Sequence, residues 1–251
     1  MKTKKIELYI HIPFCKSKCR YCDFCSFQAE NAVIDDYITK LKEELIFWGK
    51  KLTKEEVVTV FIGGGTPSYL KEQYIKEICN VIFQYFKVSE NAEITIEANP
   101  GTVDLKKLCT YRESGINRIS FGLQSTIQEE LQYLGRIHTY EQFLQCYNWA
   151  REAGFCNISV DLMSAIPKQT IHSYEKNLRT IAELSPEHIS AYSLIIEEGT
   201  PFYEDENLED LLPSEEDEVR MYQMTAQILK EYGYEQYEIS NYAKKDFESR
   251  H

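Results

Sequence analysis

The sequence predicts an α/β fold, most readily a partial (β/α)6 barrel followed by the start of an α+β extension. Three observations predict it: short apolar strand-like segments recur, amphipathic helical segments separate them, and no linker breaks this rhythm before about residue 200. Parallel neighbours in a sheet need crossover connections, which are usually helices. A doubly wound sheet is the alternative that the same alternation allows.

Six strands are expected from their residue patterns. Residues 7–12 alternate between polar and apolar side chains, as in a strand with one buried face. Residues 57–62 are almost entirely apolar, as in a strand buried on both faces. The other four expected strands lie at residues 93–98, 118–122, 157–163 and 188–194.

The expected helices have apolar residues at intervals of three and four, which places these residues on one face. In the first helix this stripe includes Ile34, Ile38 and Leu45. We expect residues 1–200 to form the barrel core and residues 201–251 to begin a C-terminal region, in which Ser214 is suited to cap a helix. The helices are expected at residues 33–48, 70–86, 105–114, 127–134, 140–153, 171–184 and 219–232.

The composition excludes several classes of function. The chain has 251 residues, a net charge of −12 and scattered Lys and Arg residues, so nucleic acid is not an expected partner. The N-terminal segment lacks the apolar core of a signal peptide, and no window is apolar enough to span a bilayer. The cytoplasm is therefore the expected compartment. There, eight cysteines favour metal or redox chemistry over disulfides.

Three cysteines follow the first expected strand, and Cys15, Cys19 and Cys22 have the spacing C-x3-C-x2-C. Cluster irons take thiolate ligands, and a cubane held by only three cysteines keeps one iron open to another ligand. A structural zinc site usually has two Cys pairs roughly a dozen residues apart, so this compact loop suits zinc poorly. Cys25 has no assigned role. The other four are expected to be ordinary buried residues: Cys79, Cys109, Cys146 and Cys156.

Short fragments along the chain form a specific pattern. They are Tyr9-Ile-His-Ile-Pro-Phe-Cys15, Tyr21-Cys-Asp-Phe24, Gly63-Gly-Gly-Thr-Pro67, Glu97-Ala-Asn-Pro-Gly-Thr102, Gly122-Leu-Gln124, Leu134-Gly-Arg-Ile-His138, Asp161-Leu-Met163 and Tyr237-Glu-Ile-Ser-Asn-Tyr-Ala243. In this order they resemble radical S-adenosylmethionine (SAM) proteins of the HemN/HemW group, over nearly the whole chain. That group includes oxygen-independent coproporphyrinogen III oxidases and HemW-type haem chaperones. The resemblance implies a radical SAM barrel.

The resemblance also implies two cofactors, a [4Fe-4S] cluster held by Cys15, Cys19 and Cys22, and SAM. In such proteins the cluster reduces SAM by one electron, yielding methionine and a 5′-deoxyadenosyl radical. The resemblance does not separate cleavage of SAM from binding alone. Carboxylates would suit the SAM ammonium or ribose, and a guanidinium would suit its carboxylate. The implied SAM pocket contains Tyr9, Tyr21, Gly64, Gly65, Thr66, Glu97, Gln124, Arg136 and Asp161.

Three features favour the chaperone branch. Phe24 stands where the oxidases carry a fourth cysteine, Cys15 comes too early for their N-terminal extension, and residues 237–251 look like the HemW type. In that branch a His-Asn-x-x-Tyr-Trp motif is implicated in haem binding, and His251 would be its first residue. The chain would then be a truncated HemW with haem as cargo and haem-dependent proteins as acceptors. Peripheral membrane association and the oligomeric state stay open.

The alternative function is the oxidase reaction itself, the oxidative decarboxylation of coproporphyrinogen III to protoporphyrinogen IX. Two local expectations accompany the resemblance. As the last residue, His251 is expected to be poorly ordered. Ala165 stands where the family usually has glycine, and if that position needs a positive φ, alanine strains it.

Overall fold

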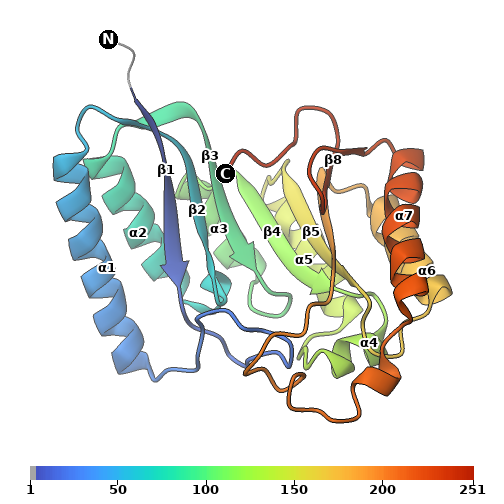
Figure 1. Ribbon diagram of the computed structural model, residues 1–251. Helices are drawn as coiled ribbons and strands as arrows, with labels where there is room; N and C mark the ends of the chain where they lie inside the picture. The colour runs from blue at the N-terminus through green and yellow to red at the C-terminus, as the bar shows by residue number, and fades with distance from the viewer. Residues whose placement is uncertain (1–3) are drawn as a thin grey trace.

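The computed structural model describes residues 4–251 and shows an open eight-stranded sheet in the order β1-β2-β3-β4-β5-β6-β8-β7. Strands β1 to β6 are parallel and bend into a partial barrel, with the helices on its outer surface (Figure 1). The expected fold is confirmed. The six parallel strands are β1 (Lys5–Ile12), β2 (Glu56–Gly64), β3 (Val88–Ala98), β4 (Arg118–Gln124), β5 (Ile158–Ser164) and β6 (His188–Ser193).

The strands follow one another in chain order, which distinguishes the partial barrel from a doubly wound sheet, where the order reverses at a switch point. Capping boxes at Thr139 and Thr170 begin two of the crossover helices. The helices are α1 (Asn31–Lys51), α2 (Glu72–Tyr85), α3 (Leu105–Glu113), α4 (Gln128–Tyr133), α5 (Tyr140–Glu152), α6 (Ile171–Leu184) and α7 (Glu215–Glu231).

The two faces of the parallel strands differ in polarity. Successive side chains of a strand point to opposite faces. On the helix-covered face, residues such as Ile96, Ile119 and Val160 are fully buried in the main hydrophobic core. On the inner face the same strands carry polar residues, including Ser120 and Asp161. Most small barrels fill this inner space with apolar layers. Here the polar inner face encloses a cavity.

The residues after position 200 continue the same sheet. Ser214 caps α7, which begins four residues before the expected helix, and α7 packs against α6. Strands β7 (Glu235–Gln236) and β8 (Asn241–Ala243) follow, with β8 antiparallel to β6. The domain boundary at residue 200 stays a prediction. No helix in the described part of the chain is long and apolar enough to cross a membrane.

The four cysteines outside the N-terminal loop divide into two kinds. Cys79 and Cys146 are buried, as expected. The expectation is wrong for Cys109, which is half-buried, and for Cys156, which is exposed. Cys156 lies in the short connection between α5 and β5, and connections run over the protein surface.

The backbone at Ala165 has the positive φ that the family pattern suggested. Its φ is 59°, in the left-handed region, and its side chain is buried. A Cβ atom in this region contacts the following carbonyl oxygen, which costs roughly 1–2 kcal/mol. Ala165 is therefore a strained residue directly after β5.

Candidate functional site

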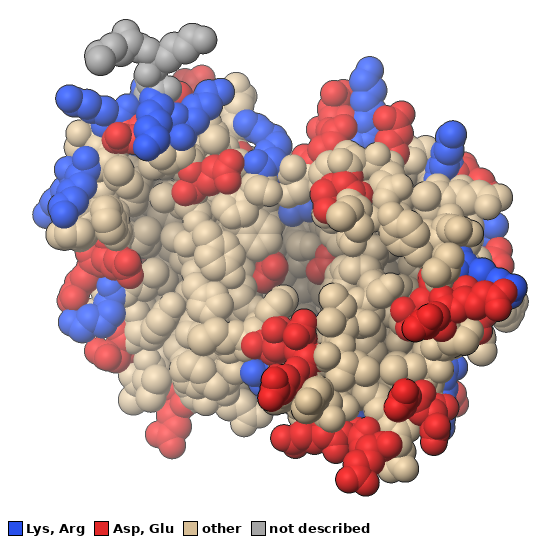
Figure 2. Space-filling model, in the orientation of Figure 1, with Lys and Arg blue, Asp and Glu red and all other residues tan. Residues whose placement is uncertain are grey.

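A cavity of about 780 Å³ runs along the inner face of the barrel. It is lined at one end by the cysteine loop and at the other by the C-terminal residues Ser249 and His251. Figure 2 shows the corresponding hollow between the two halves of the molecule, with acidic side chains inside it. Its volume lies in the range of small-molecule and cofactor sites, about 300–1,000 Å³.

The cysteine loop leaves the C-terminal end of β1. A backbone hydrogen bond of 3.1 Å from Cys15 to Phe27 closes the loop. Cys15, Cys19 and Cys22 all line the cavity, whereas the exposed Cys25 does not. Instead, the Cys25 carbonyl accepts a hydrogen bond of 2.9 Å from His11 Nε2. The loop therefore directs three of its four cysteines toward the cavity.

The thiols of this loop are a donor set that suits an iron–sulfur cluster. Within residues 4–251, no three His, Cys, Asp or Glu side chains converge on one metal-ion position. A cubane does not require such convergence, because each of its cysteines binds a different iron. Thiolates are the ordinary ligands of such clusters.

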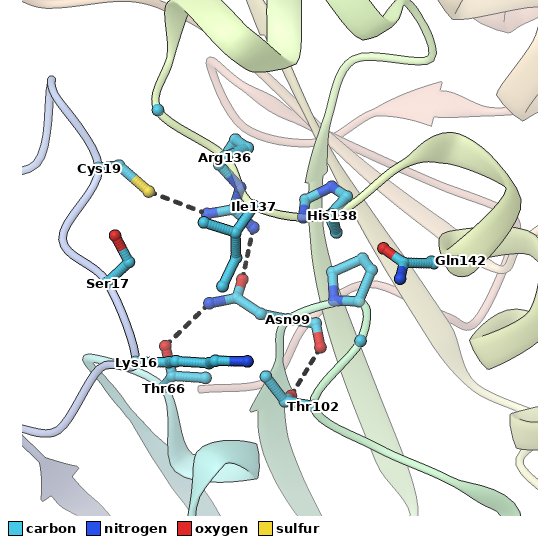
Figure 3. Close-up of a pocket in the computed structure, with 13 residues that line it drawn as sticks. Lys16, Ser17, Cys19, Thr66, Asn99, Thr102, Arg136, Ile137, His138 and Gln142 are labelled. Carbon is cyan, nitrogen blue, oxygen red and sulfur yellow. Dashed lines mark hydrogen bonds between the residues drawn. The ribbon is translucent and has the colours of Figure 1, made fainter.

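The guanidinium of Arg136 lies beside Cys19, as Figure 3 shows, and Arg136 also lines the large cavity. It donates to Cys19 Sγ at 3.4 Å and to Asn99 Oδ1 at 2.6 Å, and it also donates to the Gly122 carbonyl. Asn99 in turn donates to Thr66 Oγ1 at 2.8 Å. A second cavity, of about 110 Å³, is also lined by Cys19, Thr66, Asn99 and Arg136. Arg136 is thus a fixed positive charge next to the cysteine thiols.

The glycines at the C-terminal end of β2 are required by close contacts. A Cβ atom on Gly64, whose φ is 116°, would lie 2.5 Å from the His11 ring, and one on Gly65 would lie 3.0 Å from Cys15 Sγ. The Gly64 N–H donates to Glu97 Oε2 at 3.0 Å. These side-chain-free residues bring bare backbone to the cavity wall, where a ligand can approach it.

Two carboxyl groups inside the cavity have raised pKa values. Burial raises the pKa of Glu97 to about 7, and the nearby charge of Asp161 adds to the shift. Burial also raises the pKa of Asp161 to about 6, while a hydrogen bond from Ser120 opposes that shift. Buried carboxyls favour the neutral form unless a cation or a donor stabilises the charge. Both groups are therefore suited to meet a cationic ligand.

The remaining residues of the expected SAM pocket lie in two places. Gln124, with a φ of 74°, accepts a hydrogen bond of 2.9 Å from Tyr192, and Tyr21 lines the same end of the cavity. Tyr9 does not line the cavity itself but stacks on Phe61, which does.

The side chain of His251 is packed, contrary to the expectation of poor order. Its ring stacks on Phe61 at 5.1 Å and lies 6.3 Å from the Tyr9 ring, and the side chain is 21% exposed. Its Nδ1 lies 2.9 Å from Thr59 Oγ1. With the proton on Nδ1 donated to Thr59, the lone pair of Nε2 is left for a metal ion.

Several polar residues that line the cavity were not predicted. Asn99 lies within one of the family fragments, but nothing in the sequence indicated that it joins Arg136 to Thr66. The others occupy alternate positions of strands, a period-2 polar pattern that could have indicated a polar inner face. They are Arg118, Ser120, His188, Ser190 and Tyr192.

Comparisons with known proteins agree with this architecture. The radical SAM superfamily model matches residues 9–181. The chain is 40% identical to the "Heme chaperone HemW" of Bacillus subtilis, over 97% of this chain and 65% of that protein. It is 37% identical to the protein of the same name from Escherichia coli, over 100% of this chain and 66% of that protein.

Among solved structures, the coproporphyrinogen III oxidase HemN from Escherichia coli is similar, with a TM-score of 0.89 and 29% identity over 98% of this chain and 56% of that one. The chain spans about 65% of the length of the HemW proteins that it matches. The fold and the cysteine loop agree with the family that the model identifies. The chain belongs to the radical SAM superfamily, and it is similar to HemW proteins and to HemN.

Proposed function

We propose that this chain is the haem-binding radical SAM part of a haem chaperone that passes haem to haem-dependent proteins. One observation carries the proposal: a single cavity joins the cysteine loop to His251, whose Nε2 is oriented by the contact of Nδ1 with Thr59. Imidazole is the usual protein ligand of haem iron. The similarity to HemW proteins supports the same function.

In this proposal Cys15, Cys19 and Cys22 hold a [4Fe-4S] cluster, and the cavity residues beside them hold SAM. When bound, the cluster would be the one-electron donor and SAM the electron acceptor. The chain fits them because the three cysteines of one loop line the cavity and Arg136 holds Cys19 in place through a hydrogen bond of 3.4 Å to its Sγ atom. Glu97 and Asp161 would bind the cationic parts of SAM, and the bare backbone at Gly64 would admit its methionyl end.

The proposal is tested by a haem titration, followed by the Soret band, on anaerobically reconstituted protein with SAM present. We expect saturable binding of one haem per chain. Iron and sulfide analysis of the same samples checks the cluster independently. Haem absorbance that rises without saturation, as with free haem, would contradict the chaperone proposal.

A second candidate function is the oxygen-independent oxidation of coproporphyrinogen III. The similarity to the HemN structure favours it. Phe24 opposes it, because the oxidases carry a cysteine at that position. Anaerobic turnover with SAM and a reductant, read as porphyrin fluorescence after oxidation, separates the two candidates: product formation supports the oxidase, and haem binding without product supports the chaperone.

A further inference from the structure

Arg118, the first residue of β4, is a buried guanidinium with no bonding partner in the described chain. The residue is 3% exposed and lines the large cavity. Its Nε atom is enclosed without a hydrogen bond, and its terminal nitrogens donate to none of residues 4–251. Buried polar groups nearly always have a partner, and buried charges are almost always paired. Arg118 thus presents donors to the cavity that the protein does not use.

The acidic residues around Arg118 balance its charge only through space. Glu93, Asp161 and Glu97 lie close enough to stabilise its charged form, yet none accepts a hydrogen bond from it. Glu93 is instead engaged by the backbone N–H of Arg250 at 3.1 Å. Burial opposes the charge and lowers the pKa of Arg118. Nearby carboxylates therefore stabilise the positive charge of Arg118, but none of them forms a hydrogen bond with its guanidinium.

The neighbours of Arg118 along the inner face are hydrogen-bonded to one another. His188 Nδ1 lies 2.8 Å from Ser159 Oγ, and its Nε2 lies 2.8 Å from the Tyr237 hydroxyl. Burial and the charge of Arg118 lower the pKa of His188 to about 3, so this ring is neutral. The Tyr237 hydroxyl also accepts from the Ser249 N–H at 3.1 Å. Arg118 is thus the only cationic side chain of this group.

From this arrangement we propose that Arg118 binds a carboxylate of the ligand that fills the cavity, namely a propionate of the tetrapyrrole. This inference rests on the proposed haem function, which supplies a ligand with two propionates on one edge. A guanidinium and a carboxylate form paired N–H···O bonds that neither lysine nor a neutral side chain reproduces. The propionate would accept hydrogen bonds from the terminal nitrogens of Arg118, while the enclosed Nε stays out of its reach.

The distance between Arg118 and His251 suits one tetrapyrrole. The strand register pairs Phe61 with Thr95 and Thr95 with Arg118, so Phe61 and Arg118 lie two strands apart on one ladder, roughly 10 Å. His251 stacks on Phe61. A haem whose iron meets His251 therefore extends its propionate edge over a distance of this order, toward Arg118.

The test compares haem with haem dimethyl ester, which keeps the iron and the ring but has no free carboxylate. Each is titrated into wild-type, Arg118→Gln and Arg118→Lys protein and followed by the Soret band. We expect wild-type protein to bind haem about 10- to 100-fold more tightly than the ester. Arg118→Gln should weaken haem binding by that factor and leave ester binding unchanged. Arg118→Lys should fall between the two.

Arg220→Gln on the exposed face of α7 is the matched control, and it should bind both porphyrins as wild-type protein does. SAM affinity is measured in parallel, because SAM also carries a carboxylate. Lower SAM affinity with unchanged haem affinity in Arg118→Gln would assign Arg118 to SAM and overturn the inference. If circular dichroism shows that Arg118→Gln does not fold, the inference is still tested by the affinities of wild-type and Arg118→Lys protein for haem and for its dimethyl ester.

The outcomes separate the inference from the function on which it rests. If wild-type protein binds neither porphyrin, the proposed function fails and the inference fails with it. If wild-type protein binds haem and its ester equally well, the haem function stands and the role of Arg118 is refuted.

Discussion

The two ends of the cavity hold two arginines that differ in their hydrogen bonding. At the cysteine end, Arg136 donates to Cys19, to Asn99 and to the Gly122 carbonyl. At the other end, the guanidinium of Arg118 has no hydrogen-bond partner in the part of the chain that the structure describes. Arg118 is buried at the start of β4, Arg136 is half-buried in the connection between α4 and α5, and both line the large cavity.

This difference in hydrogen bonding indicates a different role for each arginine. A guanidinium whose donors are occupied by protein groups holds those groups in position, so Arg136 fixes the wall beside the cysteines. A guanidinium whose donors are free is preorganised for an anion from outside. We therefore interpret the cysteine end as a prebuilt cofactor site and the Arg118 end as a ligand site.

The largest expected effect comes from a substitution in the cysteine loop. Cys19→Ser should abolish the [4Fe-4S] cluster, because serine does not supply the thiolate that iron requires. Cys25→Ser is the matched control, since Cys25 lies outside the cavity, and it should retain the cluster. Iron and sulfide content with the visible absorption of the reconstituted proteins measures both. Full cluster content in Cys19→Ser would refute the metal assignment.

The next effect concerns the opposite end. His251→Ala should weaken haem binding by at least roughly 100-fold, because loss of an iron ligand costs no less than loss of a group that orients one. The Soret maximum should also shift toward that of free haem. His172→Ala, an exposed histidine on α6, should leave both quantities unchanged. An unaltered Soret band in His251→Ala would exclude His251 as the ligand.

The third prediction uses the carboxyls between the two ends. Their pKa values in the folded chain, about 7 for Glu97 and about 6 for Asp161, lie above the ordinary values of 4.5 and 3.8. These two carboxyls therefore bind protons more tightly in the folded state than in the unfolded state. Their contribution to the free energy of unfolding is complete below about pH 4 and is lost as pH rises through about 7. Urea unfolding without SAM should show a decrease of roughly 1–3 kcal/mol in the free energy of unfolding from pH 5 to pH 8.

Glu97→Gln should flatten that pH dependence, because a neutral amide does not ionise. Glu129→Gln, on the exposed surface of α4, is the control and should keep the wild-type slope. Stability that rises between pH 5 and pH 8 in both variants and in wild-type protein would show that other groups dominate the pH dependence.

The smallest effect sharpens the comparison at the cysteine end, where Ala165 leaves β5 with a φ of 59°. Ala165→Gly should stabilise the protein by roughly 0.5–1 kcal/mol, because relief of the left-handed strain exceeds the loss of one buried methyl. Ala182→Gly, inside helix α6, should instead destabilise it by about 1 kcal/mol. Urea unfolding measures both, and destabilisation by Ala165→Gly would show that the strain is absent.

Much of the fold follows from local patterns. The alternation of strands and helices, the cap at Ser214 and the cysteine spacing are all local in sequence, and the structure agrees with the fold they predict. The expectation failed at Cys156, because a single residue beside a strand carries no signal of whether its connection is exposed. The order of His251 was also mispredicted, since its stacking on Phe61 joins segments nearly the whole chain apart.

The class of fold, the family resemblance and the three cysteines that suit a cluster could all be predicted from the sequence, because they depend on residue type and short spacing. The three-dimensional structure was needed to show which polar residues share the cavity, that Arg136 contacts Cys19, and that Arg118 has no hydrogen-bond partner within residues 4–251. The physical reason is that hydrogen bonding depends on distances across strands. Those distances are set by register and barrel curvature, which no local pattern encodes.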